Sequence, residues 1–253
     1  MASARRAAGY GANVAVIESN SLGGTCVNVG CVPKKVMYNA GTVSEILQEA
    51  HYFGFKVETP KFNWLALKTK RDKYICRLNT IYKNMLESSN ITLVSGQAVF
   101  SGPNTVNVDG KPYTADNILI AVGGRPSLPS PTDLPGVEHC ISSDAFFAME
   151  TQPRAVAVIG AGYIGVELAG VFNALGSTTD LFTRRDKLLS AQFDDMVVNA
   201  LAVEMGKRGV RHVPNQVVAR VVKDPADGTL TLLTQSGQKF GPYDQVGGRL
   251  HNL

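Results

Sequence analysis

The chain has 253 residues, of which 44% are hydrophobic and 18% charged, a composition typical of a globular protein. A formal net charge of +4, with no long basic run, argues against nucleic acid as a partner. Four cysteines in a chain of this length exclude a scaffold built on disulfides and favour a reducing compartment. We therefore expect a cytoplasmic protein, although an N-terminus rich in Ala, Arg and Ser leaves an organellar form open.

No membrane span is expected from the sequence. The most apolar stretch, residues 155–176, carries Glu167 in its middle and several glycines, which a lipid-spanning helix would not tolerate well. Small molecules are therefore the expected partners.

Hydrophobic periodicity and turn residues predict alternating helices and strands along the chain. The first elements are a helix ending in glycine and a strand, followed by two longer helices, further strands, a proline-rich crossover and a late hairpin. The first helix and strand are predicted over residues 2–11 and 13–18, and the two longer helices over 36–49 and 63–88. Further strands are predicted over 91–108, with a turn at 101–104. The proline-rich crossover covers 126–135 and the hairpin 217–233, with a break at 225–228.

Cys26 and Cys31 are separated by only four residues. A disulfide closing so short a loop gains little stabilisation in the chain-entropy model, which favours redox chemistry over a structural role. Lys34 and Lys35 follow at once, and cations or a helix N-terminus beside a thiol favour its thiolate. The segment therefore predicts a redox-active pair with a lowered thiol pKa.

Two alternatives remain for this pair. Cys26 and Cys31 could be reduced core cysteines that share this spacing by coincidence. A zinc site would need about four ligands, whereas Cys76 and Cys140 are isolated in the sequence. We accordingly expect no metal.

A glycine-rich motif lies between two predicted strands in the second half of the chain. Residues 156–176 read as strand, GxGxxG and amphipathic helix, and a second strand follows. Gly160 permits the tight turn, Gly162 lets the backbone approach a pyrophosphate, and Gly165 lets helix and strand pack closely. This order predicts a dinucleotide site, the alternative being a glycine-rich turn of another fold.

The residues that end the second strand select the nicotinamide cofactor. Arg184 and Arg185 follow Thr183, and arginine accommodates the 2′-phosphate of NADP where an acid would hold the ribose of NAD. Asp180 is expected inside the strand and therefore away from the ribose. The sequence favours NADPH, with two solvated surface arginines as the alternative.

The N-terminal residues repeat the second half of this unit. In that register the counterparts of its three glycines fall before Met1, and Glu18 takes the place of the acid that holds a first cofactor's ribose. We expect an α/β fold with two Rossmann-like, three-layer nucleotide-binding domains, the first incomplete. The expected bounds are 1–148 for the FAD-binding domain and 149–253 for the NADP-binding domain.

Three segments resemble the flavin-dependent pyridine nucleotide-disulfide oxidoreductases. Residues 23–35 are similar to the active-site segment of that family, 118–124 to the strand and glycine turn that close its FAD domain, and 160–170 to its NAD(P) motif. The resemblance covers residues 2–246, nearly the whole chain.

Within that family the resemblance points to members that reduce glutathione disulfide. It places Arg5 against a substrate carboxylate and Tyr74 and Tyr82 at contact positions of the substrate-binding helix, while Arg184 implies NADPH. Independently of the family, the two tyrosines belong to an apolar helical stripe that core packing alone would also explain.

The resemblance also implies a mechanism. Hydride would pass from NADPH to one face of FAD, and the flavin would reduce the disulfide on its other face, with Cys26 attacking the substrate and Cys31 facing the flavin. Lys34 would lie near the flavin and pair with Glu167, and Tyr163 would cover the nicotinamide pocket. A solvated Glu167 is the alternative.

The catalytic residues implied in this way are Cys26, Cys31, Lys34 and Glu167. Those implied for the two cofactors are Glu18, Gly24, Thr25, Lys34, Ala98, Gly123, Gly160, Gly162, Tyr163, Ile164, Gly165, Glu167, Arg184 and Arg185.

The family's dimer-interface domain, with the His-Glu pair that protonates the leaving thiol, has no counterpart in the sequence. We therefore expect an incomplete, weakly active or inactive form of a homodimeric enzyme. A non-catalytic NADP-binding remnant and a thioredoxin or dihydrolipoamide type of reductase are the alternative functions.

Overall fold

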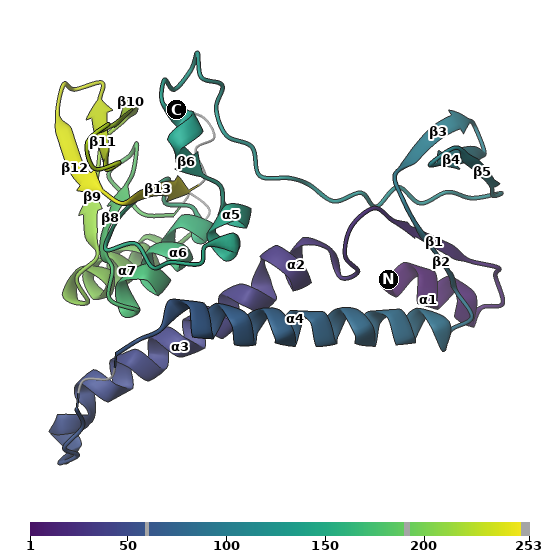
Figure 1. The fold of residues 1–253 in the computed structure, drawn as a ribbon, viewed down its shortest axis with the longest axis horizontal. Helices are drawn as coiled ribbons and strands as arrows, with labels where there is room; N and C mark the ends of the chain where they lie inside the picture. The colour runs from purple at the N-terminus through teal and green to yellow at the C-terminus, as the bar shows by residue number, and fades with distance from the viewer. Residues whose placement is uncertain (59–60, 190–192, 249–253) are drawn as a thin grey trace. The chain divides into compact units, whose positions relative to one another are not determined.

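The computed structural model of the protein describes residues 1–58, 61–189 and 193–248. The chain divides into two compact units, the first made of residues 1–33 and 69–124 and the second of residues 34–68 and 125–253. Helices α3 (Cys31–Glu49) and α4 (Trp64–Glu87) contribute residues to both units. Figure 1 traces the order of the elements. The predicted division into a FAD domain and an NADP domain concerns which cofactor each part holds, and it stays a prediction.

The first unit combines short helices with a parallel and an antiparallel sheet. Strands β1 (Ala15–Glu18) and β2 (Thr92–Ser95) pair in parallel, so that the helix-strand start predicted for residues 2–18 is confirmed. The antiparallel sheet has the order β3-β4-β5. The remaining elements of this unit are α1 (Ala2–Gly9), α2 (Gly24–Val29), β3 (Ala98–Gly102), β4 (Thr105–Val108) and β5 (Lys111–Thr114).

One predicted strand of this unit is wrong. Residues 118–124 are not a strand, and Leu119, Ile120 and Val122 are 72%, 65% and 90% exposed. A strand needs a neighbour whose N–H and C=O groups complete its ladder, and no described strand pairs with this segment. Conversely, β5 was not predicted, because its sequence Lys-Pro-Tyr-Thr gives little hydrophobic alternation.

The second unit is built on a five-stranded parallel sheet with the order β6-β13-β7-β8-β9. Helices connect the strands from β6 to β9, whereas an antiparallel sheet forms the connection from β9 to β13. Its elements are η2 (Val137–His139), β6 (Cys140–Ile141), α5 (Ser143–Ala148), β7 (Ala155–Ile159), α6 (Tyr163–Ala174), β8 (Thr178–Phe182), α7 (Asp195–Lys207), β9 (Arg211–Val213) and β13 (Gln245–Gly248).

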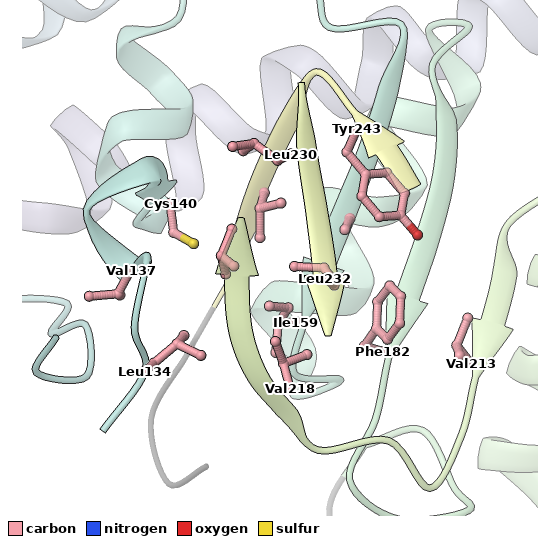
Figure 2. Close-up of a cluster of buried hydrophobic side chains, with 13 residues drawn as sticks. Leu134, Val137, Cys140, Ile159, Phe182, Val213, Val218, Leu230, Leu232 and Tyr243 are labelled. Carbon is pink, nitrogen blue, oxygen red and sulfur yellow. The ribbon is translucent and has the colours of Figure 1, made fainter. Parts of the chain in front are cut away.

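A three-stranded antiparallel sheet packs on one face of the parallel sheet. It consists of β10 (Val218–Lys223), β11 (Leu230–Thr234) and β12 (Lys239–Tyr243), and its first two strands confirm the predicted hairpin. Figure 2 shows the core between the two sheets, where Ile159 and Phe182 meet Leu232 and Tyr243. Burying such side chains stabilises each by about 1.5–3 kcal/mol.

The opposite face of the parallel sheet carries a separate aromatic cluster. The indole of Trp64 stacks on Phe172 of α6 at 5.9 Å and meets Phe146 of α5 edge-on at 6.0 Å. Its Nε1–H donates to the Met149 carbonyl at 2.9 Å. The first turn of α4, which is preceded by the 3₁₀ helix η1 (Ala50–Phe53), is thereby held against the other elements of the second unit. Trp64 is the only tryptophan of the chain and reports on the folding of this unit.

Asp180 lies in the middle of β8, as predicted, and is buried. Its carboxylate accepts hydrogen bonds from Arg211 Nε at 2.7 Å, from Arg211 Nη2, and from the Tyr243 hydroxyl at 2.5 Å. These contacts turn the carboxylate toward the neighbouring strands β9 and β12. Burial and the nearby carboxylate raise the pKa of Tyr243. Asp180 is therefore a structural residue that ties three strands together.

Replacing Asp180 by asparagine is expected to lower the free energy of unfolding by about 2–3 kcal/mol, because a charged acceptor for Arg211 and Tyr243 is lost. Urea unfolding followed by Trp64 fluorescence measures the change. Glu204→Gln, which removes an exposed ion pair with Lys207, is the control and should leave the curve in place. An unchanged midpoint for Asp180→Asn would contradict the structural role.

In the part of the chain that the structure describes, no helix has both the length and the hydropathy to cross a membrane.

Candidate functional site

The two cysteines lie at the start of consecutive helices in the first unit. Cys26 is in the first turn of α2, and Cys31 is the first residue of α3. Gly30 joins the helices, and a side chain there would lie 2.9 Å from the Thr25 carbonyl oxygen, so that only glycine allows so close a turn. Both cysteines are exposed free thiols, and they lie close enough for Cys31 to influence the pKa of Cys26. The two thiols are therefore accessible to reagents in solution and close to one another.

The predicted direction of the thiol pKa is wrong for Cys26. Its pKa is raised, because the hydrogen bond with the Cys31 side chain, partial burial and the charge of Cys31 all favour the protonated form. The backbone N–H of Cys31 opposes this only in part. The lysines expected to lower the pKa make other contacts, Lys34 with Glu167 and Lys35 with the ring of Tyr38.

Two asparagines hold the cysteine segment in place. Asn79 of α4 donates through its side-chain amide to the Leu22 carbonyl at 2.6 Å and to Asn28 Oδ1 at 3.0 Å. Asn28 in turn donates to the carbonyl of Gly24 at 2.9 Å. Sequence reasoning missed both residues, because their partners are up to 57 positions away and no motif marks them.

The residues predicted to contact substrate gather around α4 in the first unit. The Arg5 guanidinium lies 3.4 Å from Ser89 Oγ, just beyond the end of α4, and 3.9 Å from Met85 Sδ. Tyr74 is 40% exposed, and Tyr82 is partly buried. Core packing therefore does not explain Tyr74, whereas the buried stripe of the helix includes Ile75 and Leu86.

The residues predicted to contact FAD are distributed over loops and strand ends of the same unit. Glu18 ends β1 and its Oε1 accepts the backbone N–H of Asn20 at 2.9 Å, which leaves the other carboxylate oxygen for a ribose hydroxyl. Ala98 begins β3, and Gly123 has a φ of 70°. Gly24 and Thr25 open α2, whose N-terminal N–H groups suit a phosphate. The chemistry of these groups fits the flavin nucleotide.

Lys34 and Glu167 form an ion pair in the second unit. The ammonium nitrogen lies 2.6 Å from Oε1, and the two side chains are 26% and 40% exposed. Glu167 is therefore paired with Lys34, as the resemblance implies, while its side chain keeps part of its exposure to solvent. Their proposed catalytic role is a separate matter and stays a prediction.

The glycine loop of the second unit has the geometry of a dinucleotide site. Gly160 has a φ of 95°, and its N–H donates to the Phe182 carbonyl at 2.9 Å. A side chain at Gly165 would lie 1.9 Å from the Gly160 carbonyl oxygen, whereas one at Gly162 would meet open space. The loop is thus packed against α6 on one side and accessible at its apex, which fits a bound pyrophosphate.

The remaining cofactor residues flank this loop. Tyr163 is 59% exposed at the first position of α6, followed by the half-buried Ile164. Arg184 and Arg185 are exposed directly after β8 and Thr183. The Leu189 N–H donates to the Ala161 carbonyl at 2.7 Å, which fastens the arginine segment to the glycine loop. The two elements that NADP requires are therefore adjacent.

Fold and site together define a class of redox proteins that hold nucleotides and a reactive pair of cysteines. The family model for pyridine nucleotide-disulphide oxidoreductases matches residues 1–246, and the chain belongs to this family. The predicted α/β nucleotide-binding fold is confirmed. Enzymes of this family use a flavin and a pyridine nucleotide, in agreement with the predicted FAD and NADPH.

Two curated relatives are named glutathione reductase. The protein from Yarrowia lipolytica is 45% identical over 251 residues, which cover 94% of this chain and 53% of that protein. The protein from Schizosaccharomyces pombe is 43% identical over 248 residues, which cover 95% of this chain and 53% of that protein. The chain spans about half the length of the curated relatives it matches.

Proposed function

We propose that the protein reduces glutathione disulfide with electrons from NADPH, through FAD and the Cys26–Cys31 pair. The observation that carries this proposal is the pair itself, two exposed free thiols near the starts of consecutive helices. It is supported by the likeness to two glutathione reductases over about 95% of the chain.

The family resemblance assigns different roles to the two cysteines of the pair. The Cys26 thiolate attacks one sulfur of glutathione disulfide, which breaks the S–S bond, forms a mixed disulfide and releases one glutathione thiolate. Cys31 then attacks Cys26 Sγ and expels the second glutathione. The two thiol protons pass to the two glutathione molecules, and the enzyme is left with a Cys26–Cys31 disulfide.

Other residues of the chain bind and orient. Arg5, Tyr74 and Tyr82 hold the glutathione groups, with the guanidinium facing a carboxylate. Glu18, Gly24, Thr25, Ala98 and Gly123 hold the flavin nucleotide.

FAD, when bound, would supply the two-electron chemistry that links NADPH to the Cys26–Cys31 disulfide. The NADPH site consists of the glycine loop, Arg184 and Arg185. Lys34, held by Glu167, keeps a positive charge for the flavin, and Tyr163 covers the nicotinamide pocket. A cytoplasmic homodimer is the form we expect.

The first test is consumption of NADPH by the purified protein, supplied with FAD and followed by absorbance after glutathione disulfide is added. We expect consumption that depends on glutathione disulfide. If NADPH is oxidised with thioredoxin or lipoamide but not with glutathione disulfide, the substrate in the proposal must be replaced. If NADPH is oxidised with none of these three compounds, the proposal is overturned.

A second candidate function is binding of NADP without turnover. It is favoured by one contrast: the second unit has a five-stranded parallel sheet, whereas the parallel sheet of the first has two described strands. Calorimetry distinguishes the two functions, because this candidate predicts NADP⁺ binding without flavin uptake.

A further inference from the structure

His212 lies on strand β9, which pairs with β8. The residues that follow β8 and Thr183, 184–189, are called the arginine segment here. Its ring is half-buried, and Nε2 lies 2.8 Å from the hydroxyl oxygen of Thr183, the residue that directly precedes Arg184. Thr183 itself is only 3% exposed. Neither residue belongs to the motifs that mark the nucleotide site.

The direction of the hydrogen bonds is fixed by chemistry. Thr183 Oγ1 lies 2.6 Å from the Arg185 carbonyl oxygen, which can only accept, so the hydroxyl hydrogen is committed to it. The same hydroxyl must then accept from His212, whose Nε2 carries a hydrogen. Burial lowers the pKa of His212, although the carboxylate of Asp186 opposes this, and the neutral Nε2–H form makes the bond.

This chain of hydrogen bonds ends on the backbone of the arginine segment. The Arg185 carbonyl also accepts the Asn215 N–H at 3.3 Å, and Leu188 anchors the segment at 2% exposure. Together with the Leu189 bond to the glycine loop, these contacts fix the direction of the peptide groups around Arg185. The exposed guanidinium groups start from that backbone.

We propose that His212 is a positioning residue that acts through Thr183 to hold the arginine segment for the 2′-phosphate of NADPH. The inference rests on the proposed function, since it assigns the arginines to that phosphate. His212 acts through Thr183 and does not itself contact the cofactor in the proposed arrangement. It contributes to the choice between NADPH and NADH by keeping Arg184 and Arg185 in register with the glycine loop.

NADP⁺ and NAD⁺ differ only in the 2′-phosphate, so their two dissociation constants separate positioning from folding. If the full net worth of one such hydrogen bond is lost from the nucleotide-bound state, the affinity falls about fivefold to tenfold. His212→Leu should weaken NADP⁺ binding by that factor and leave NAD⁺ binding unchanged. Both constants are measured by calorimetry on the 253-residue chain.

Three further variants sharpen the test. His212→Gln should recover most of the NADP⁺ affinity, because its amide supplies an N–H in place of Nε2. Thr183→Val should weaken NADP⁺ binding as His212→Leu does, and combining the two should cost little more than either alone. His139→Leu, at a partly exposed histidine of the same unit outside the site, should change neither constant.

The results separate the inference from the proposed function. If wild-type protein prefers NADP⁺ but His212→Leu keeps the full preference, or weakens both nucleotides equally, the inference is overturned and the cofactor assignment stands. A glutamine variant as weak as the leucine variant would also overturn it. A wild-type protein without preference for NADP⁺ would overturn both.

Discussion

Replacing Gly165 by alanine is expected to abolish NADP⁺ binding and to destabilise the second unit by about 2–3 kcal/mol or more. The new methyl group would lie 1.9 Å from the Gly160 carbonyl oxygen, a backbone atom that cannot swing aside. Helix α6 must then move away from the glycine loop, which displaces the N–H groups that face the pyrophosphate. Calorimetry with NADP⁺ and urea unfolding by Trp64 fluorescence measure the two effects.

Gly170→Ala is the matched control on the same helix. A methyl group at Gly170 meets nothing within 4 Å, and alanine favours a helix over glycine by up to about 1 kcal/mol. This variant should bind NADP⁺ normally and unfold at the same or higher urea concentration. Equal behaviour of the two variants would contradict the close packing of loop and helix.

Replacing either redox cysteine by serine is expected to reduce NADPH-dependent reduction of glutathione disulfide by at least about a thousandfold. The two variants should fail in different ways. Cys31→Ser keeps the attacking thiol but lacks the resolving one, so Cys26 should accumulate as a stable mixed disulfide with glutathione. Cys26→Ser should form no such adduct at Cys31, because Cys26 is the residue assigned to substrate.

Cys76→Ser, at an exposed thiol of α4, is the control and should react as wild type does. Intact mass measurement after treatment with glutathione disulfide identifies the adducts. A glutathione adduct on Cys26→Ser but not on Cys31→Ser would reverse the two roles. Full turnover by either variant would remove the pair from the mechanism.

Structural features that depend on a short stretch of sequence could be predicted. The GxGxxG motif predicts a turn and helix start because Gly160 adopts a positive φ and Gly165 packs closely on the loop, and the structure has β7, α6 and β8 in the predicted order. Asp180 could be placed inside its strand by counting from Thr183. The Lys34–Glu167 pair came from the family resemblance, since nothing in the local sequence connects positions 133 residues apart.

The predictions that were wrong, and the residues that were missed, depend on contacts between distant segments of the chain. The raised pKa of Cys26 reflects which groups face the thiol, and the lysines next in sequence face others. The bonds from Asn79 to the cysteine segment and from His212 to Thr183 join elements that meet only in the folded chain. Residues 118–124 have the composition of a strand, but a strand exists only with a partner.

The proposed reaction requires that NADPH reduces a disulfide between Cys26 and Cys31. It is tested most directly by oxidising the FAD-supplied protein with glutathione disulfide, removing the excess, adding NADPH without oxygen, and locating alkylated cysteines by mass spectrometry. We predict that Cys26 and Cys31 are blocked together before NADPH and alkylated together after it, while Cys76 is alkylated throughout. The proposed reaction would be contradicted if Cys26 and Cys31 could still be alkylated after treatment with glutathione disulfide, or if NADPH left their disulfide intact.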